Sequence, residues 1–386
     1  MDRSTLDRRL CRDRPWQRSP RSRRKVVLGR RGAQGPWCRS RHRGCRPCSD
    51  HEPRLSPDDA RQSRFCDAGT PRARTDAARR RPVRHVRRLH AQLEGFRHRL
   101  TKGTVSVVEV QRLTGVFGAE VDVGDVRRLD DGAFAELRSV VCEHEVVVVR
   151  GQSLDVTEQV ALSRRFGPAG PVPFIEPSPD HPEVIKVLKE ASDGAAFNFG
   201  GAWHSDFSFQ SEPPSFTLLH AIDIPPYGGD TLWASMTAAW KHLSDDRRAE
   251  LSAITAVHTA RDAYSRKMQP LHSGLSGMNI VCDDTANDTE VHPLVVTHPE
   301  TGRQALFFNR AYVRDLLGVD AVRLQSLLDW LHAHTTDARF TLRHRWSVGD
   351  LVIWDNRSTQ HYALNDYAGF RRELHRTTVA GTRPTA

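Results

Sequence analysis

The chain has 386 residues and a formal net charge of +10, because 57 Lys and Arg residues outnumber 47 Asp and Glu residues. This length allows one large domain or two ordinary ones. The positive charge suggests a nucleic-acid-binding protein, but residues 1–102 carry a net charge of +20 and residues 103–386 a net charge of −10. Nucleic acid is therefore not the expected partner of the acidic body, residues 103–386.

Residues 1–102 contain 28 Arg residues and only two Lys residues. Such a segment cannot bury enough apolar surface to offset its chain entropy, so we expect disorder. Three interpretations compete: a basic arm that binds nucleic acid, a small metal site at Cys45 and Cys48 with His42 and His51, and an upstream extension outside the working protein. We favour the extension, because GC-rich DNA upstream of a true start encodes such Arg-rich stretches. The natural start is then expected near residues 104–105.

The acidic body holds only two of the seven cysteines, Cys142 and Cys282, which is typical of a reduced intracellular protein. No apolar run approaches the roughly 18–20 residues of a membrane span. Residues 22–31 resemble a twin-arginine signal, but the apolar stretch after them is too short for export. We expect a cytoplasmic protein with no membrane partner.

The body begins with alternating apolar residues over 104–126, which predict strands. A helical pattern over 130–145 precedes a buried-strand run at 145–152. Asp155 followed by Glu158 predicts a helix start. Further helices are expected over 236–254, broken near Ser244, and over 319–336. Residues 340–346, 350–364 and 371–381 read as three strands.

These elements do not repeat as strand–helix–strand units, and no glycine-rich phosphate loop follows a strand. A nucleotide-binding fold is therefore not expected. The pattern favours a mainly β protein with helices, such as a β-sandwich or jelly roll.

Residues 203–209, WHSDFSF, place two metal-capable side chains two positions apart. If this stretch is a strand, His204 and Asp206 point to the same face. His361, on a later predicted strand, is the best third candidate, although each residue taken alone is also compatible with an ordinary core or surface role. Two histidines and one carboxylate form the facial triad of non-haem Fe(II) oxygenases, which leaves coordination positions open.

Three separated motifs resemble the taurine dioxygenase-like family of Fe(II)- and 2-oxoglutarate-dependent dioxygenases. They are HSD at 204–206, PPYGGDTLWAS at 225–235 and WDNRSTQHYALNDYAGFRRELHRTTV at 354–379. The resemblance spans roughly residues 104–384. It implies a double-stranded β-helix, also described as a jelly-roll or cupin-like fold, for the dioxygenase domain at residues 103–386.

The resemblance also implies roles for individual residues. His204, Asp206 and His361 match the iron ligands. Thr231 and Arg372 match the residues that hold the far carboxylate of 2-oxoglutarate, and a guanidinium group suits a carboxylate. Arg376, on the same strand face as Arg372, matches the residue that binds the anionic group of the primary substrate. The implied reaction uses O2 and hydroxylates a small organic anion, or cleaves it through hydroxylation, giving succinate and CO2.

The substrate pocket is predicted to be less polar than that of taurine-specific members. Those members have histidine and tyrosine where this chain has Pro173, Phe174 and Ile175. We therefore expect only weak stimulation by taurine. Asn198 is a candidate hydrogen-bonding residue for the substrate, and the aromatic residues Trp203, Phe207 and Phe209 are candidates for keeping the site dry.

Two alternatives stay open: a nucleic-acid-binding protein that acts through its basic arm, and an inactive relative that binds a small molecule without turnover. The complete triad and Arg372 argue against the inactive relative. A homo-oligomer is compatible with the resemblance, since relatives are often dimers or tetramers.

Overall fold

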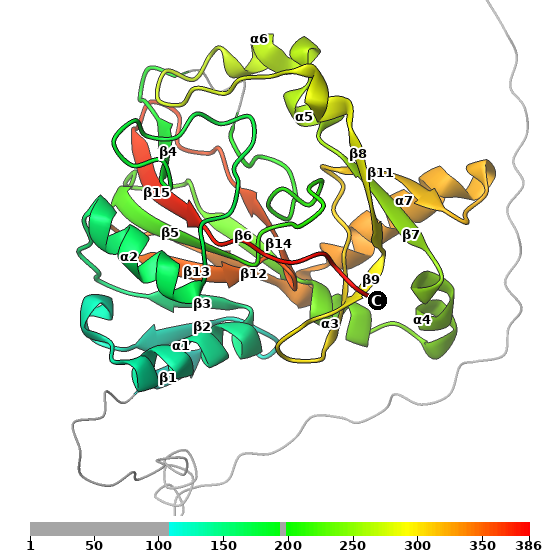
Figure 1. The fold of residues 1–386 in the computed structure, drawn as a ribbon, viewed down its shortest axis with the longest axis horizontal. Coiled ribbons are helices and arrows are strands. Elements are labelled where there is room, and N and C mark those ends of the chain that lie inside the picture. Colours follow the sequence, from blue (N-terminus) through cyan, green and yellow to red (C-terminus); the bar gives the residue numbers. More distant parts are fainter. Residues whose placement is uncertain (1–107, 194–197) are drawn as a thin grey trace, which may run out of the picture. The chain divides into compact units, whose positions relative to one another are not determined.

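The structure, a computed structural model, describes residues 108–193 and 198–386 (Figure 1). All of the predictions for residues 1–102, and the expected start near residues 104–105, lie outside the described residues.

Two β-sheets form the frame of the described body. The larger sheet has the order β1-β2-β3-β13-β5-β15-β4, and its strands are β1 (Glu109–Arg112), β2 (Ala119–Asp122), β3 (Val146–Val149), β4 (Ile185–Lys189), β5 (Phe216–Asp223), β13 (Leu351–Asp355) and β15 (Arg372–Thr378). The smaller sheet has the order β12-β6-β14, formed by β6 (Thr231–Ser235), β12 (Thr341–His344) and β14 (Thr359–Ala363). Neighbouring strands are antiparallel, apart from the parallel pair β2–β3. This arrangement confirms the predicted jelly-roll fold.

The centre of the larger sheet is buried on both faces, which explains the unbroken apolar run of β3. Successive strand residues point to opposite faces. Val147 packs in one core cluster with Leu137 of α1 (Asp131–His144), and α2 (Val156–Phe166) also contributes to that cluster. Val148 packs in a second cluster with Trp233 of the smaller sheet and Trp354. Helices therefore cover one face, and the smaller sheet covers the other.

Residues 236–340 form an insertion between β6 and β12, coloured light green to orange in Figure 1. Its helices are α3 (Met236–Lys241), α4 (Asp245–Ser252), α5 (Arg261–Tyr264), α6 (Gln269–His272) and α7 (Ala321–Thr335). Its strands are β7 (Thr255–Thr259), β8 (Thr289–Pro293), β9 (Val295–Thr297), β10 (Gln304–Leu306) and β11 (Val313–Leu317). The insertion has a core of its own, which includes Trp240, Leu251, Leu306 and Leu331.

Most predicted elements are confirmed, including the helix break at Ser244, which is the N-cap of α4. The single strand predicted over 350–364 is wrong, because β13 and β14 lie in different sheets. The chain turns between them: the Asp355 side chain accepts a hydrogen bond from the Arg357 N–H, and the Asp355 carbonyl accepts one from the Thr359 hydroxyl. The region 340–380 therefore contains four strands.

Residues 203–209 do not form the strand that was considered as a way for His204 and Asp206 to share a face. His204 forms an isolated β-bridge with His361, and a turn begins at Asp206. Phe207 has a φ of 44°, a left-handed conformation that a strand does not contain. His204 and Asp206 therefore approach each other through a turn rather than through strand alternation.

Within the described ranges, no helix is both long enough and apolar enough to cross a membrane.

The capping box of α2 gives a first testable prediction. The Asp155 carboxylate accepts a hydrogen bond from the Glu158 N–H at 2.7 Å, and the Glu158 carboxylate accepts one from the Asp155 N–H at 2.9 Å. Asp155→Ala is expected to lower the free energy of unfolding by about 1 kcal/mol, measured by urea denaturation. Ser153→Ala, at a nearby exposed position, serves as the control and is expected to change stability by less than about 0.5 kcal/mol.

Candidate active site

A pair of backbone hydrogen bonds brings the two candidate histidine ligands together. The His204 N–H donates to the His361 carbonyl at 3.0 Å, and the His361 N–H donates to the His204 carbonyl at 2.7 Å. The imidazole ring centroids consequently lie 4.1 Å apart. His361 is on β14, so the smaller sheet anchors the segment that carries His204 and Asp206.

The Asp206 carboxylate is oriented by a chain of three buried side chains. Its Oδ2 accepts a hydrogen bond from the Thr217 hydroxyl at 2.7 Å. The Thr217 oxygen accepts one from Asn356 Nδ2 at 2.9 Å, and Asn356 Oδ1 accepts one from the Trp354 indole at 2.9 Å. Because Asn356 occupies an acceptor position of the threonine hydroxyl, the hydroxyl hydrogen is directed to Asp206. Oδ1 is left to face the histidines.

The three candidate ligands have the geometry of a metal site. Asp206 Oδ1 lies 3.8 Å from His204 Nε2 and 3.9 Å from His361 Nε2. Ligand atoms about 2.1 Å from a common ion lie at most about 4.2 Å apart, so one ion fits between these atoms. The His204 Nδ1–H donates to the Ala202 carbonyl at 2.7 Å, so Nε2 is the nitrogen with a lone pair available to a metal.

The electrostatics of the site also suit metal binding. Burial lowers the pKa of both His204 and His361, so their imidazoles stay neutral, as metal ligands must be. Burial by itself raises the pKa of Asp206, but the positive charge of Arg376 and the hydrogen bond from Thr217 hold that pKa below its ordinary value. The Asp206 carboxylate is therefore ionised in the folded protein.

A cavity of about 740 Å³ opens beside these ligands and has the size of a small-molecule site. His204, Asp206 and Arg376 line it together with aromatic residues. Arg376 is only 4% exposed, and its Nη1 lies 3.3 Å from Asp206 Oδ1. Its Nε and Nη2 have no hydrogen-bond partner in the described part of the chain. A buried guanidinium with unused donors is suited to an anionic ligand.

Thr231 and Arg372 are both buried and both lie next to Trp346. The Trp346 indole donates to the Thr231 hydroxyl at 3.0 Å, and the Arg372 guanidinium carbon lies 5.8 Å from the Trp346 ring. Arg372 packs closely on Gly229, where an added Cβ would come within 3.0 Å of the arginine side chain. Arg372 is not among the residues lining the 740 Å³ cavity, whereas Arg376 is.

The other predicted pocket residues fall into two groups. Asn198, Trp203 and Phe207 line the cavity, and the Asn198 Nδ2 is already used by the Ala363 carbonyl at 2.6 Å. Residues 173–175 are not among the lining residues. The Phe174 ring instead stacks on Tyr264, a lining residue, with 5.0 Å between centroids. Phe209 likewise packs against Tyr312, with 4.9 Å between centroids.

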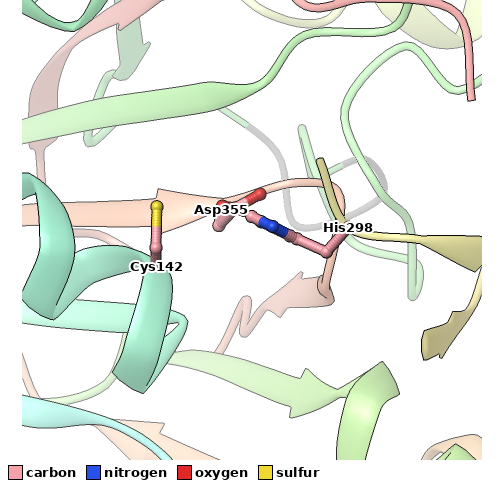
Figure 2. Close-up of side chains that lie close together, drawn as sticks. All are labelled: Cys142, His298 and Asp355. Carbon is pink, nitrogen blue, oxygen red and sulfur yellow. Dashed lines mark hydrogen bonds and ion pairs between the residues drawn. The ribbon is translucent and has the colours of Figure 1, made fainter. Parts of the chain in front are cut away.

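Sequence reasoning missed a second group of metal-capable residues, Cys142, His298 and Asp355, shown in Figure 2. The Asp355 carboxylate accepts hydrogen bonds from Arg357 Nε at 2.8 Å, Arg357 Nη2 at 2.6 Å and His298 Nε2 at 2.8 Å. His298 Nδ1 accepts from the N–H groups of residues 300 and 301. Both imidazole nitrogens are therefore occupied, and this group works as a clamp on the turn between β13 and β14. A histidine far along the chain from its aspartate gives no local sequence signal.

Comparison with known proteins identifies the family. The profile of the "Taurine catabolism dioxygenase TauD, TfdA family" matches residues 109–378. The chain belongs to this family. The predicted reaction class, an Fe(II)- and 2-oxoglutarate-dependent dioxygenase that consumes O2, is thereby confirmed.

Individual relatives of the TauD, TfdA family agree with this assignment. The chain is 34% identical over 277 residues to an alkylsulfatase of Acinetobacter baylyi, covering 71% of this chain and 85% of that protein. It is 32% identical over 286 residues to an alpha-ketoglutarate-dependent 2,4-dichlorophenoxyacetate dioxygenase of Cupriavidus pinatubonensis, covering 68% and 94%. A solved taurine dioxygenase structure from Burkholderia xenovorans matches with a TM-score of 0.60 and 31% identity, covering 72% and 93%.

The orientation of Asp206 by Thr217 can be tested through metal affinity. Thr217→Val removes the donor to Asp206 Oδ2 and leaves Asn356 Nδ2 without its acceptor. Loss of such a supporting hydrogen bond is expected to weaken metal binding about 10- to 100-fold, measured as the Kd for Mn(II) by electron paramagnetic resonance titration.

Thr378→Val is the matched control for this experiment. Thr378 pairs with Thr217 in the sheet register, and its hydroxyl is buried without a hydrogen-bond partner in the described ranges. Its replacement is expected to leave Mn(II) affinity unchanged. Equal losses in the two variants would contradict the orienting role of Thr217.

The clamp at Asp355 predicts a pH-dependent contribution to stability. Although burial raises the pKa of this carboxyl, Arg357 and His298 hold it well below its ordinary value. Because the folded-state pKa is lowered, the contribution is present above the unfolded pKa of about 4 and is lost as the pH falls below it. Asp355→Asn is expected to cost about 3 kcal/mol at pH 7 and to flatten the acid dependence of the free energy of unfolding.

Asp337→Asn provides the comparison, because Asp337 makes the same contacts with an arginine two residues later but is partly exposed. We expect a much smaller loss of stability there. Both losses in the free energy of unfolding are measured by urea titration at pH 7. Equal losses in the two variants would show that burial of the Asp355 clamp adds nothing to stability.

Proposed function

We propose that His204, Asp206 and His361 bind the Fe(II) of this dioxygenase, that Thr231 and Arg372 hold the far carboxylate of 2-oxoglutarate, and that Arg376 binds the anionic end of the primary substrate. The observation that carries this proposal is the convergence of the three ligand side chains. Two of them, His204 and Asp206, line one cavity together with Arg376, a buried arginine with unused donors. The bound iron would supply oxidation of a substrate C–H bond by O2, coupled to conversion of 2-oxoglutarate to succinate and CO2.

The chain's own residues have separate tasks in this proposal. Thr217 keeps Oδ2 of Asp206 occupied, so that the carboxylate presents Oδ1 to the metal. Arg376 neutralises the anionic end of the substrate and fixes its distance from the ligands. Trp203 and Phe207 line the cavity and exclude water from it. Asn198 contributes a substrate contact through its amide oxygen, because its nitrogen is already used.

We propose a small organic anion with a mainly apolar body as the substrate. The arginine matches the anion, and the aromatic lining matches the apolar body. The named relatives act on alkyl sulfates and on an aryloxyacetate, which are both anions of this kind. Weak stimulation by taurine stays a prediction.

A cytoplasmic location is part of the proposal, supported by two buried cysteines, Cys142 and Cys282, that form no disulfide. Formation of a homo-oligomer also stays a prediction.

The experiment that tests the proposed roles compares two arginine variants. Succinate release is measured with Fe(II), ascorbate and 2-oxoglutarate over carboxylates, sulfonates, sulfate esters and aryloxy acids. Loss of a charge-assisted bidentate contact costs about 1.5–3 kcal/mol, or roughly 10- to 100-fold in affinity. Arg376→Lys is therefore expected to raise KM for the best anion about 10- to 100-fold and to change KM for 2-oxoglutarate little.

Arg372→Lys serves as the reciprocal control, with the larger rise expected in KM for 2-oxoglutarate. His204→Ala, Asp206→Ala and His361→Ala are each expected to abolish succinate release. The assignment of the arginines is wrong if the two KM effects are exchanged, and an inactive relative is indicated if no anion stimulates the wild-type protein.

A further inference from the structure

Two buried tyrosines from the insertion line the cavity beside the metal ligands. Tyr264 is the last residue of α5, and Tyr312 directly precedes β11; they are 6% and 4% exposed. The Tyr312 ring centroid lies 6.3 Å from that of His204, in an edge-on arrangement. Both tyrosines share the cavity with Arg376.

The surrounding structure holds both rings in place. The Tyr264 ring is stacked between Phe174, at 5.0 Å, and His272, at 5.8 Å between centroids. The Tyr312 N–H donates to Asn309 Oδ1 at 2.9 Å, and Asn309 Nδ2 donates to the Ser208 hydroxyl at 2.9 Å. Ser208 is two residues from Asp206, so Tyr312 is tied to the metal-binding segment. Fixed positions of this kind are expected of groups that select a ligand.

The two tyrosines line the same cavity, and each shifts the pKa of the other. Their two hydroxyl groups carry two hydrogens. A hydrogen bond between the hydroxyls would use one of these hydrogens and would leave the other for a third group.

Both hydroxyls remain protonated near neutral pH. Burial raises the pKa of Tyr264 to about 12, and burial together with Tyr264 raises the pKa of Tyr312 well above its ordinary value. Arg376 and Asp206 act electrostatically on both groups, which agrees with their place in the same cavity. The tyrosine pair is therefore an uncharged hydrogen-bond donor in the same cavity as the positively charged donor Arg376.

The number of donors distinguishes two kinds of anion. Arg376 has Nε and Nη2 without partners among the described residues, and these adjacent donors match two oxygens of an anion. A carboxylate has only two oxygens and is satisfied by them. A sulfonate or sulfate ester has a third terminal oxygen, directed away from the plane of the first two, which needs a donor from elsewhere.

We propose that the Tyr264–Tyr312 hydroxyl pair donates a hydrogen bond to the third oxygen of the bound anion, and that with Arg376 it makes this enzyme select tetrahedral sulfur oxyanions over planar carboxylates. This inference rests on the proposed role of Arg376. It separates the two substrate classes named among the relatives, alkyl sulfates and aryloxyacetates.

The test uses two ligands with the same alkyl chain, hexane-1-sulfonate and heptanoate. Their Kd values are measured by calorimetry on the Fe(II)-loaded protein with 2-oxoglutarate in the absence of O2, and succinate release is measured in air. The wild-type protein is expected to bind the sulfonate at least tenfold more tightly. In Tyr264→Phe/Tyr312→Phe this preference is expected to fall to about threefold or less, through weaker sulfonate binding and with heptanoate binding unchanged.

The single variants, Tyr264→Phe and Tyr312→Phe, identify which hydroxyl carries the free hydrogen, because one of them is expected to behave like the double variant. They also keep the test decisive if the double variant does not fold. Tyr362→Phe removes a hydroxyl from another lining tyrosine, which stacks on Trp203 at 5.8 Å. This control is expected to keep the preference for the sulfonate.

Two results would overturn the inference: a wild-type protein that binds heptanoate as tightly as the sulfonate, or a preference for the sulfonate that survives in the single and double phenylalanine variants. Failure of the proposed function has a different signature, since no anion would then stimulate succinate release by the wild-type protein.

Discussion

The site depends on one short backbone contact, the pair of hydrogen bonds between His204 and His361. These residues lie far apart in the chain, and among the described residues the bridge at His204 is an isolated one. The bridge fixes both imidazoles at once, and the smaller sheet holds it in place through β14. The hydrogen-bonded side chains of Thr217, Asn356 and Trp354 orient Asp206. Together with the bridge, they bring the three candidate ligand atoms close to one another. Preorganisation of this kind lets a metal bind without further ordering of the chain.

The turn between β13 and β14 connects the core to this site. Asp355 is clamped by Arg357 and His298, while the next residue, Asn356, supports Thr217. A buried ion pair is often a costly way to gain stability. Here it also defines where the chain crosses from the larger sheet to the smaller one, and thus where His361 begins its strand. The clamp and the candidate metal site are therefore supported by adjacent residues of the same turn.

The sequence was sufficient for the fold class, and it singled out three side chains, His204, Asp206 and His361, that lie close together in the structure. Apolar periodicity and spaced motifs are local signals, which is why these features could be predicted. It was insufficient for the way in which the ligands meet. Alternation in a strand predicted that His204 and Asp206 face the same side, whereas a turn at Asp206 with Phe207 at positive φ brings them together. Contacts such as His298–Asp355 and Tyr264–Tyr312 depend on how an insertion folds back on the sheets. The residues that neighbour either partner in the sequence give no sign that the two partners meet.

The candidate active site combines residues from two parts of the chain. Tyr264 and Tyr312 come from the insertion between β6 and β12, whereas His361 and Arg376 come from the two sheets. In our proposals, the sheets carry a metal ligand and the anion-binding arginine, and the inserted stretch adds two hydroxyl donors. The rings of Tyr264 and Tyr312 pack in one cluster with Ile185 and Phe207, which belong to the rest of the body. An inserted stretch can therefore change the preference for an anion only through side chains that still fill this shared core.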